Sequence, residues 1–577
     1  MMSGLPRPEY PRPQFVRKDW MNLNGEWDFS FDTDTFDRKI TVPYAYQAKL
    51  SGIGIRDAHD VVWYRKRFDL PEWASGKRVF IHFGAVDYEC EVYLNGSFIT
   101  RHTGGHIGFS AEITGVARPV GNEVTLCVTD VTKDMEMPRG KQFWENESRG
   151  IFYTRTTGIW QTVWIEAVEA SHLRRVWLTP DIDNSSVGIE YEICGRAEQM
   201  DICVGYRGAG VAAVTIRLPE EKGEIHIKLN RVLEECLWSP EHPNLFDIQF
   251  VIKDENNMMD ITQSYFGLRK VSVENGVFML NNLPYYQKLL LDQGYWPDST
   301  ITAPTDGDYI QDIRLAKEMG FNGARKHQKI EDPRFLYHAD KMGFLVWGEI
   351  AAAYEYSRKY VKRIMNEFID EVFRDYNHPC IVAWTPLNES WGVREALTNK
   401  EQRHHIKAMV HTIKSLDGTR LVSSNDGWEH AGVTDMLTIH DYDSRKGVLK
   451  ERYKSVESAV KAMPAKGFIL VEGAYSGQPI LITEFGGISY QKDSQAGWGY
   501  SNAQNDDDLI NRYYDVVSAL LESPVIQGFC YTQITDVEQE INGLLTYHRQ
   551  PKVDVRVIKA INDGLNPYEL SKHTVVI

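Results

Sequence analysis

The stretch "CIVAWTPLNESWG" (residues 380–392) decides the fold of the C-terminal half of this 577-residue chain. It begins as a continuous apolar run and ends in Asn388 and Glu389. A second stretch, "PILITEFGG" (479–487), places Glu484 after an equally apolar run. Short runs of this kind predict strands that are buried on both faces, as in a parallel sheet covered by helices. A carboxylate at the end of a buried strand therefore needs an explanation.

Short apolar runs alternate with helical patterns from about residue 283 onward. The predicted strands cover 285–292, 321–327, 344–350, 381–389, 420–426, 436–442, 480–486 and 526–533. Amphipathic helices lie between several of them, and "DGDYIQDIRLAKEMG" (306–320) ends in the Gly expected after a helix. Eight β/α repeats predict a (β/α)8 TIM barrel, to which we assign residues 273–577. The stretch after the sixth strand is long for one connection, and a lid or a subunit contact is left open for it.

The first 170 residues alternate apolar and polar side chains with a period of two. Examples are "VVWYRKRFDL" (61–70) and "EVTLCVTD" (123–130). Asn95-Gly96 lies between two such runs and is typical of a hairpin turn. We therefore predict a jelly-roll-like β-sandwich over residues 1–170.

Residues 171–272 also alternate, with short strands at regular spacing. About 100 residues with this pattern predict a small immunoglobulin-like β-sandwich. Cys194 and Cys203 lack the Cys…Trp…Cys spacing of antibody domains, so we expect no core disulfide.

Composition excludes several classes of function. The formal net charge of −16 argues against nucleic acid and against an anionic membrane surface as partners. The chain has seven scattered cysteines without a CxxC pair, which favours free thiols in a reducing compartment. The first residues show no apolar signal region, and no segment approaches 18 apolar residues. We expect a cytoplasmic protein, and a homo-oligomer is left open.

Glu389 ends the predicted fourth barrel strand and Glu484 ends the seventh. Barrel enzymes carry their chemistry at the carboxyl ends of the strands, so both side chains are expected to converge over the barrel mouth. Two convergent carboxylates are what glycoside hydrolysis requires, since one protonates the leaving oxygen and the other attacks the anomeric carbon or activates water. The alternative for each is a solvated or Arg-paired residue, and the matching positions of the two favour function.

At these residues the sequence resembles glycoside hydrolase family 2, whose members include β-galactosidases, β-glucuronidases and β-mannosidases. The resemblance rests on W-x-x-x-N-E at 384–389 together with "TEFGG" at 483–487. It extends over almost the whole chain, because "LNGEWDF" (23–29) and "TTGIWQTVWIE" (156–166) resemble the N-terminal sandwich of that family. "NNLPYY" (281–286) resembles the entry into its barrel.

The resemblance implies a retaining mechanism without a cofactor. Glu389 would be the general acid and then the base, and Glu484 the nucleophile. Carboxyl groups about 5 Å apart repel, so one keeps its proton near neutrality, and we expect that one to be Glu389. The resemblance also implies that Asn388 binds the sugar 2-OH and that Tyr442 donates to the nucleophile. The alternative for Tyr442 is a ring in the core or in a lid.

Other residues at strand ends, with one from the N-terminal sandwich, are further candidates for substrate binding. They are Asp292, Arg325, Lys326, Trp391, His440, Tyr531 and Asp130. Tyr531 takes the place of a Trp common in the family, and Asp130 resembles a family Asp that reaches from the N-terminal sandwich into the site. Trp391 is a candidate sugar platform, with rim packing as its alternative.

Departures from the family pattern bear on the substrate. In "RKHQKI" (325–330), Gln328 stands where the family often has His, and Lys326 and Lys329 add positive charge that could hold a hexuronate. The Asn-x-Lys of β-glucuronidases is matched only by Asn542-Gly543-Leu544, without the Lys. We therefore expect an exo-β-glycosidase of the β-galactosidase kind, acting on a small-molecule or oligosaccharide β-glycoside. A β-hexuronidase (β-galacturonidase or β-glucuronidase) is the alternative, and a non-catalytic carbohydrate-binding protein is a third hypothesis.

No catalytic metal is expected. The metal-binding members carry Glu and His ligands after the third strand, where this chain reads "EIAAAYEY" (349–356). Alanine side chains offer no ligand atom, so the stretch cannot supply that set.

Overall fold

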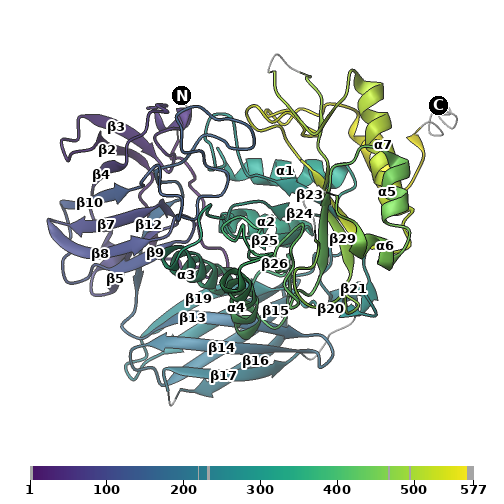
Figure 1. Cartoon of the computed structure of the whole chain (residues 1–577). Helices are drawn as coiled ribbons and strands as arrows, with labels where there is room; N and C mark the ends of the chain where they lie inside the picture. Colours follow the sequence, from purple (N-terminus) through teal and green to yellow (C-terminus); the bar gives the residue numbers. More distant parts are fainter. Residues whose placement is uncertain (1–3, 219, 230–233, 465–467, 493–495, 568–577) are drawn as a thin grey trace, which may run out of the picture.

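The computed structural model describes residues 4–218, 220–229, 234–464, 468–492 and 496–567. Two β-sandwiches precede a parallel barrel surrounded by helices, as the sequence predicts (Figure 1). Each of the three parts has its own cluster of buried apolar side chains.

The N-terminal sandwich is built from a four-stranded and a six-stranded antiparallel sheet. Its strands are β1 (Trp20–Asn22), β2 (Gly25–Phe31), β3 (Arg38–Val42), β4 (Val61–Phe68), β5 (Arg78–Phe83), β6 (Val86–Asp87), β7 (Glu89–Leu94), β8 (Ser97–Thr103), β9 (Phe109–Glu112), β10 (Asn122–Thr129), β11 (Gly158–Ile159) and β12 (Val163–Val168). The sheet orders are β1-β12-β5-β9 and β3-β2-β4-β10-β7-β8, with β11 and β6 as a separate pair. Alternate residues of β10 are buried, which places Val124, Leu126 and Val128 in the core between the sheets.

The second sandwich pairs a three-stranded sheet with a four-stranded one. Its strands are β13 (His172–Asp181), β14 (Ser186–Cys194), β15 (Gln199–Tyr206), β16 (Ala209–Arg217), β17 (Lys222–Lys228), β18 (Phe246–Lys253) and β19 (Met259–Phe266). The orders are β13-β14-β17 and β16-β15-β18-β19. All seven cysteines of the chain are free, so the prediction of no core disulfide here is confirmed. A small sheet, β20 (Val271–Glu274), β21 (Val277–Leu280) and β22 (Leu283–Pro284), leads into the barrel.

Eight parallel strands form the barrel. They are β23 (Gln287–Asp292), β24 (Gly323–Lys326), β25 (Leu345–Glu349), β26 (Ile381–Thr385), β27 (Leu421–Val422), β28 (Leu437–Asp441), β29 (Ile480–Gly486) and β32 (Ile526–Thr532). The order is β27-β26-β25-β24-β23-β32-β29-β28, so β27 and β28 are its two ends. Ser423 Oγ and Thr438 Oγ1 lie 3.1 Å apart and bridge these ends. Each of the eight predicted runs contains one of these strands.

Most of the barrel helices begin at residues suited to capping. They are α1 (Asp306–Glu318), α2 (Pro333–Met342), α3 (Arg358–Asp375), α4 (Lys400–Leu416), α5 (Lys446–Arg452), α6 (Val456–Lys461), α7 (Asp506–Leu521) and α8 (Val555–Asn562). Asp332 accepts a hydrogen bond from the backbone of Arg334, and Pro333 occupies the first helical position of α2. The remaining elements are the 3-10 turns η1 (Lys49–Ser51), η2 (Glu72–Ala74) and η3 (Glu234–Cys236), and the pair β30 (Ile488–Ser489) and β31 (Ser501–Asn502).

The prediction of eight complete β/α repeats is wrong at the fifth. Residues 423–436, between β27 and β28, are fully described and form a loop without a helix. This loop carries Asp426, which is completely buried. The connection serves the site rather than the outer helical layer.

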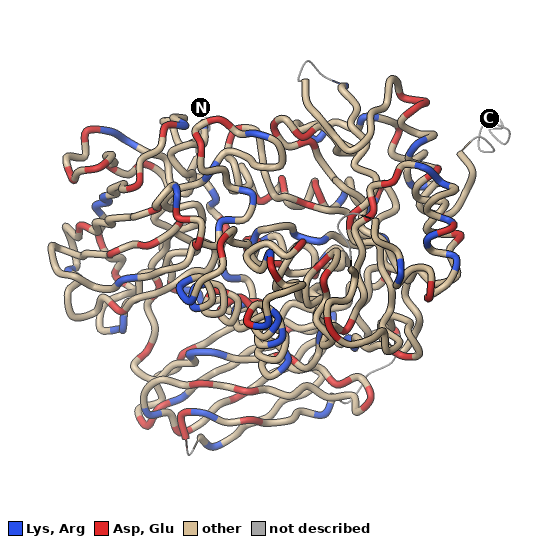
Figure 2. Tube along the Cα trace, in the orientation of Figure 1, with Lys and Arg blue, Asp and Glu red and all other residues tan. Residues whose placement is uncertain are grey.

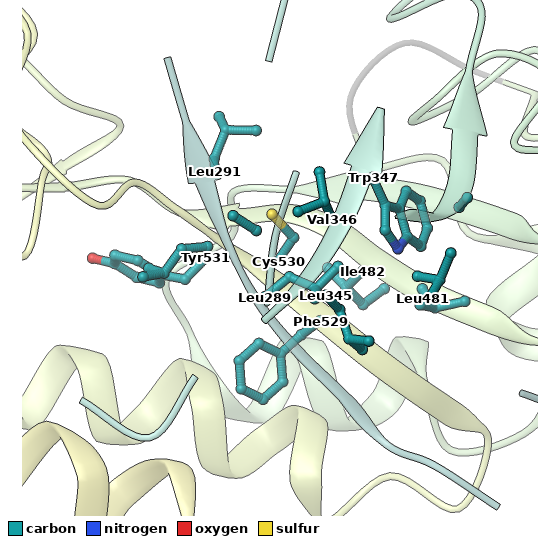
Figure 3. Close-up of a cluster of buried hydrophobic side chains, with 14 of the residues drawn as sticks. Leu289, Leu291, Leu345, Val346, Trp347, Leu481, Ile482, Phe529, Cys530 and Tyr531 are labelled. Atoms are coloured by element: carbon teal, nitrogen blue, oxygen red, sulfur yellow. The ribbon is translucent and has the colours of Figure 1, made fainter. Parts of the chain in front are cut away.

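Apolar side chains fill the barrel interior and the layer around it (Figure 3). Leu289, Leu345, Ile482 and Phe529 come from four different strands and are fully buried. Trp347 on β25 is also fully buried, and its ring nitrogen donates to Gln287 Oε1 over 2.8 Å. A filled interior provides the rigid base on which the ends of the strands present polar side chains.

Buried hydrogen bonds connect each of the two sandwiches to the barrel domain. Glu367 on α3 accepts a hydrogen bond of 2.7 Å from the backbone of His106 in the N-terminal sandwich. Trp238 of the second sandwich donates to the carbonyl of Asp340 at 2.8 Å. Acidic and basic residues are interspersed over all three parts (Figure 2). The described helices include none long and apolar enough to cross a membrane.

Candidate active site

Glu389 lies in a tight turn beyond the end of β26. Glu389 and Ser390 have φ values of 52° and 58°, a region that costs a residue with a side chain about 1 kcal/mol or more. The turn is held by hydrogen bonds from Glu389 N to the carbonyl of Asp426 (2.9 Å) and from Ser390 N to Asn425 Oδ1 (2.9 Å). The β26 and β27 connections together therefore fix the direction of the Glu389 carboxylate.

Glu484 lies within β29, next to the barrel axis. Tyr442 donates its hydroxyl to Glu484 Oε2 at 2.6 Å, and Arg325 Nη1 donates to Oε1 at 3.1 Å. The ring of Tyr442 is stacked on that of Tyr500, with centroids 3.4 Å apart. One carboxylate oxygen thus faces a phenol and the other a guanidinium, which fixes the orientation of the side chain.

The two carboxylates converge, with His440 of β28 between them. A carboxylate oxygen of Glu389, a carboxylate oxygen of Glu484 and a ring nitrogen of His440 all lie within 4.8 Å of one another. His440 Nδ1 is 2.9 Å from Glu389, and Nε2 is 2.8 Å from Asp426. The Glu389 side chain keeps about 20% of its surface exposed, so a ligand can reach it.

The charge on His440 reverses the expected protonation of Glu389. Burial alone lowers the pKa of His440, but Glu484, Asp426 and Glu389 raise it to about 10. Burial likewise raises the pKa of Glu389, but the hydrogen bond and charge of His440, with Lys141 and Arg325, bring it below its ordinary value. These pKa shifts favour the proton on His440 over Glu389 in the free protein, in contrast to the sequence-based expectation of a protonated Glu389.

Arg325, at the end of β24, is a completely buried cation among three carboxylates. It contacts Glu349 at 2.6 Å, Asp426 at 2.5 Å and Glu484 at 3.1 Å. Despite burial, these charges hold the pKa of Arg325 well above its usual range. Arg325 Nη2 also donates to Asn388 Oδ1 at 2.5 Å, which leaves the Asn388 amide hydrogens directed to the site. Arg325 thus orients the carboxylates and the Asn388 amide that surround it.

Lys326 does not face the site. Its ammonium lies 2.6 Å from Asp292 and 2.7 Å from Glu331, and its side chain is 2% exposed. Lys329 contacts Glu331 and donates to the carbonyls of Gly294 (2.9 Å) and Ile301 (2.7 Å). The prediction that Lys326 binds substrate is therefore wrong, since both lysines neutralise a buried acidic pair.

Tyr531 also points away from the two carboxylates. Its ring packs against Tyr513 of α7 (5.0 Å between centroids) and Phe485 of β29, with its hydroxyl directed outward (Figure 3). Neighbouring strand residues face opposite sides, so Thr532 faces inward instead. Thr532 Oγ1 lies 3.1 Å from the Tyr442 hydroxyl. The prediction that Tyr531 contacts the sugar is therefore wrong, because the next residue, Thr532, faces the site instead.

Asp130 is confined to the N-terminal sandwich. It accepts a hydrogen bond from Thr157 and is 3% exposed, and burial, with the neighbouring Asp60, raises its pKa despite Arg139 and Arg155. None of its described contacts is to the barrel carboxylates. The structure therefore does not bring Asp130 to the predicted site.

Trp391 lines one wall next to Glu389. It is 8% exposed and packs with Phe152 and Tyr354, at 5.8 and 5.4 Å between ring centroids. Phe152 belongs to the N-terminal sandwich, so this wall is shared by two domains. Packing, the alternative considered for Trp391, accounts for most of its surface.

Three site residues escaped the sequence prediction. Asp426 follows the fifth strand, just as the predicted site residues follow other barrel strands, and that placement could have identified it. Glu540 is 3% exposed and accepts from the Tyr153 hydroxyl at 2.6 Å, and burial raises its pKa despite Lys141. Lys141 comes from the N-terminal sandwich, and nothing in its local sequence indicates a barrel contact.

The trio Glu389, His440 and Glu484 also has the spacing of a metal site. Both ring nitrogens of His440 are hydrogen-bonded to carboxylates, however, and its raised pKa keeps both protonated. A metal ligand needs a neutral imidazole with a free nitrogen. The group is suited to holding a proton rather than a metal.

The three parts of the chain match three sequence families. Residues 271–566 match "Glycosyl hydrolases family 2, TIM barrel domain", residues 25–156 match "Glycosyl hydrolases family 2, sugar binding domain", and residues 171–269 match "Glycosyl hydrolases family 2".

Individual relatives are distant. A β-galactosidase of Thermoanaerobacter pseudethanolicus is 28% identical over 447 residues, covering 74% of this chain and 57% of the relative. A β-glucuronidase of Paenibacillus borealis is 24% identical, covering 96% of this chain and 98% of the relative. The solved β-D-glucuronidase of Dictyoglomus thermophilum superimposes with a TM-score of 0.78 at 21% identity, over 97% of this chain and 99% of that one. The chain thus spans little more than half of the first relative and nearly all of the other two.

Proposed function

Because this chain belongs to family 2 of the glycosyl hydrolases, we propose that it is a retaining exo-β-glycosidase that removes terminal β-linked sugars. One observation carries the proposal: oxygens of Glu389 and Glu484 lie within 4.8 Å. Retaining enzymes hold their carboxyl groups about 5–5.5 Å apart, whereas inverting enzymes leave about 6.5–9.5 Å for a water. The short separation of the two oxygens in this chain supports the retaining class.

In this mechanism Glu484 is the nucleophile. Its carboxylate attacks the anomeric carbon and forms a glycosyl-enzyme as the leaving oxygen departs. The hydroxyl of Tyr442 and the guanidinium of Arg325 orient it for the attack. The amide of Asn388 donates to the sugar 2-OH, a contact that tightens as positive charge develops on the ring.

Glu389 protonates the leaving oxygen. The free protein holds that proton on His440, so the proton passes along the 2.9 Å hydrogen bond to Glu389 as the leaving oxygen takes it up. His440 becomes neutral and remains hydrogen-bonded to Asp426. In the second step Glu389 removes a proton from water, which attacks the glycosyl-enzyme and releases the sugar with its β configuration.

The sugar is a β-galactoside in the first instance and a β-hexuronide as the second candidate. A β-galactosidase and β-glucuronidases are both among the relatives. Pairing of Lys326 and Lys329 removes the cations on which the hexuronide hypothesis first rested. The hexuronide candidate is supported by Lys141, a buried cation whose charge acts on Glu389.

Trapping of the intermediate tests the proposal directly. A 2-deoxy-2-fluoro-β-galactoside with a dinitrophenyl leaving group slows both steps and lets the glycosyl-enzyme accumulate, which mass spectrometry of the peptides can locate. We expect the label on Glu484, with Glu484→Gln unlabelled and inactive. Label on another residue, or a product of inverted configuration by NMR, would contradict the proposal. A protein inert on all β-glycosides would favour the carbohydrate-binding hypothesis.

We also propose a cytoplasmic location and leave a homo-oligomer as a prediction. The seven free thiols support a reducing compartment. Light scattering after size exclusion measures the oligomeric state.

A further inference from the structure

A segment of the N-terminal sandwich packs directly on the carboxyl edge of the barrel. The amides of Arg139 and Gly140 both donate to the carbonyl of Ala352 at 3.0 Å. A Cβ atom on Gly140 would lie 2.1 Å from the carbonyl oxygen of Gln328, and Gly140 has φ of 60°. Only glycine permits this approach. It delivers the next residue, Lys141, to the site.

The residues on both sides of Lys141 are anchored. The Arg139 guanidinium donates to the carbonyls of Val131, Thr132 and Asp134. Gln142 donates to Asp87 at 2.8 Å and accepts from Thr156 N at 2.6 Å. The backbone carbonyl of Lys141 accepts from Tyr153 N at 2.8 Å. The ammonium group of Lys141, by contrast, makes no hydrogen bond or ion pair with the described residues.

Lys141 is a buried cation without a carboxylate partner among the described residues. It is 8% exposed, and its Nζ lies 5.2 Å from the ring centroid of Trp391. The buried cations at and after the end of β24, Arg325, Lys326 and Lys329, all have carboxylate partners within 3 Å. The charge of Lys141 nevertheless acts on Glu389 and Glu540, since it lowers the pKa of both carboxyl groups against the effect of burial.

An unpaired ammonium in such a place is costly to the fold. Removing it from water is compensated in part by the Trp391 ring, but a carboxylate partner would compensate far more. Lys326 shows how this protein pairs a lysine that it buries for structure. The absence of such a partner for Lys141 among the described residues indicates that its partner arrives with the ligand.

We propose that Lys141 binds a carboxylate of the bound glycoside and so selects acidic substrates. The proposal rests on the retaining glycosidase activity proposed above and adds the residue that determines its specificity. The carboxylate belongs either to the cleaved sugar, as in a β-hexuronide, or to the leaving group. In either case a carboxylate would lie next to the ammonium group of Lys141, close to Glu389 and Trp391.

Kinetics on matched substrates distinguish the two sources. One arm compares p-nitrophenyl β-galactoside with p-nitrophenyl β-galacturonide and β-glucuronide. The other compares 2-nitrophenyl β-galactoside with its 4-carboxy derivative, which carries the charge on the leaving group. The proteins are wild type, Lys141→Met, Lys141→Arg and, as a control from the same segment, the exposed Lys133→Met. Thermal unfolding verifies that each variant is folded.

We expect Lys141→Met to lower kcat/KM about 10- to 100-fold more on the acidic substrates of one arm than on their neutral counterparts. Lys141→Arg should retain most of the preference, and Lys133→Met all of it. An equal loss on neutral and acidic substrates would overturn the proposal and make Lys141 an electrostatic partner of Glu389. No loss on any substrate would overturn it too. A wild type active on neutral galactosides but inert on every acidic glycoside would refute this inference and leave the proposed function standing, whereas inertness on all of them would refute the function itself.

Discussion

The imidazole of His440 lies 2.9 Å from the carboxylate of Glu389, and its other nitrogen is held by a buried aspartate. A histidine with two anionic partners keeps its proton far above its ordinary pKa, here to about 10. The acidic proton of the site is therefore a property of the pair rather than of either residue. The pair holds one proton over the whole neutral range.

This relationship predicts the effect of replacing His440 on the pH profile. In the wild type the pair loses its proton only near the raised pKa of His440, so kcat/KM should remain high up to about pH 9. In His440→Gln, Glu389 must hold the proton alone, and a catalytic Glu titrates no higher than about pH 6–7. We expect the alkaline limb to move down by about two pH units or more, together with a fall in kcat at pH 8. Stopped assays of kcat/KM from pH 4 to 10 measure it.

If His440 acts only through its charge, the alkaline limb of the pH profile should move in the opposite direction. Loss of its positive charge would then raise the pKa of Glu389 and move the alkaline limb upward.

The raised pKa of His440 also predicts how its contribution to stability depends on pH. His440 stabilises the folded state below about pH 6.5, and this contribution is lost as pH rises toward about 10. Urea unfolding of wild type and variant at pH 6 and 10 should show their difference in unfolding free energy shrinking at the higher pH.

The two tyrosines of the predicted site should respond differently to loss of their hydroxyl groups. Tyr442→Phe removes a 2.6 Å hydrogen bond to Glu484, and a bond to a carboxylate is worth about 1.5–3 kcal/mol, or roughly 10- to 150-fold in kcat. Tyr531→Phe removes a buried hydroxyl on a ring that packs against Tyr513 and Phe485, away from the two carboxylates, so activity should change less than twofold. Steady-state kinetics of both variants on one substrate provide the comparison. A large loss of activity in Tyr531→Phe would support the original prediction that Tyr531 contacts the sugar, in contradiction to its position in the structure.

Much of the fold follows from local pattern. Continuous apolar runs such as 480–486 indicate a strand buried on both faces, and the residue after each run then lies at the carboxyl edge of the barrel. This reasoning brings Glu389, Glu484, His440 and Tyr442 together, as the structure has them. The roles of these residues stay predictions until the variants are measured.

The errors arise where a side chain's direction or partner depends on distant segments. Tyr531 and Thr532 are adjacent, and one position of strand register decides which of them faces the site. Lys326 looks like a free cation in the sequence, yet Asp292 from the preceding strand and Glu331 from the following loop both reach it. Lys141 is the opposite case, a residue near the site that the sequence does not reveal, because the docking of the N-terminal sandwich brings it to the barrel. Contacts between residues that are distant in sequence cannot be predicted from the local periodicity of apolar residues.

Arg325 should be indispensable to the fold of the site. It is completely buried among Glu349, Asp426 and Glu484, and loss of one member of a buried ion cluster costs about 3–5 kcal/mol. We expect Arg325→Met to lower the free energy of unfolding by that amount and to abolish activity. Arg314→Met, which removes an exposed pair with Glu318, is the control and should cost less than about 1 kcal/mol. Comparable losses in the two variants by urea unfolding would mean that the buried cluster adds nothing to stability.

Lys326 gives the sharpest contrast with Lys141, because both are buried lysines but only Lys326 has carboxylate partners among the described residues. Lys326→Met leaves Asp292 and Glu331 without their shared cation, so we expect a loss of about 3–5 kcal/mol in the free energy of unfolding. Activity of the protein that remains folded should fall equally on β-galactosides and β-hexuronides, since the ammonium does not reach the substrate. Lys141→Met, which removes an unpaired buried charge, should leave the unfolding free energy equal to or higher than that of wild type. A selective loss of hexuronide turnover in Lys326→Met, with stability unchanged, would return the anion site to the end of β24 and remove the reason for assigning it to the N-terminal sandwich.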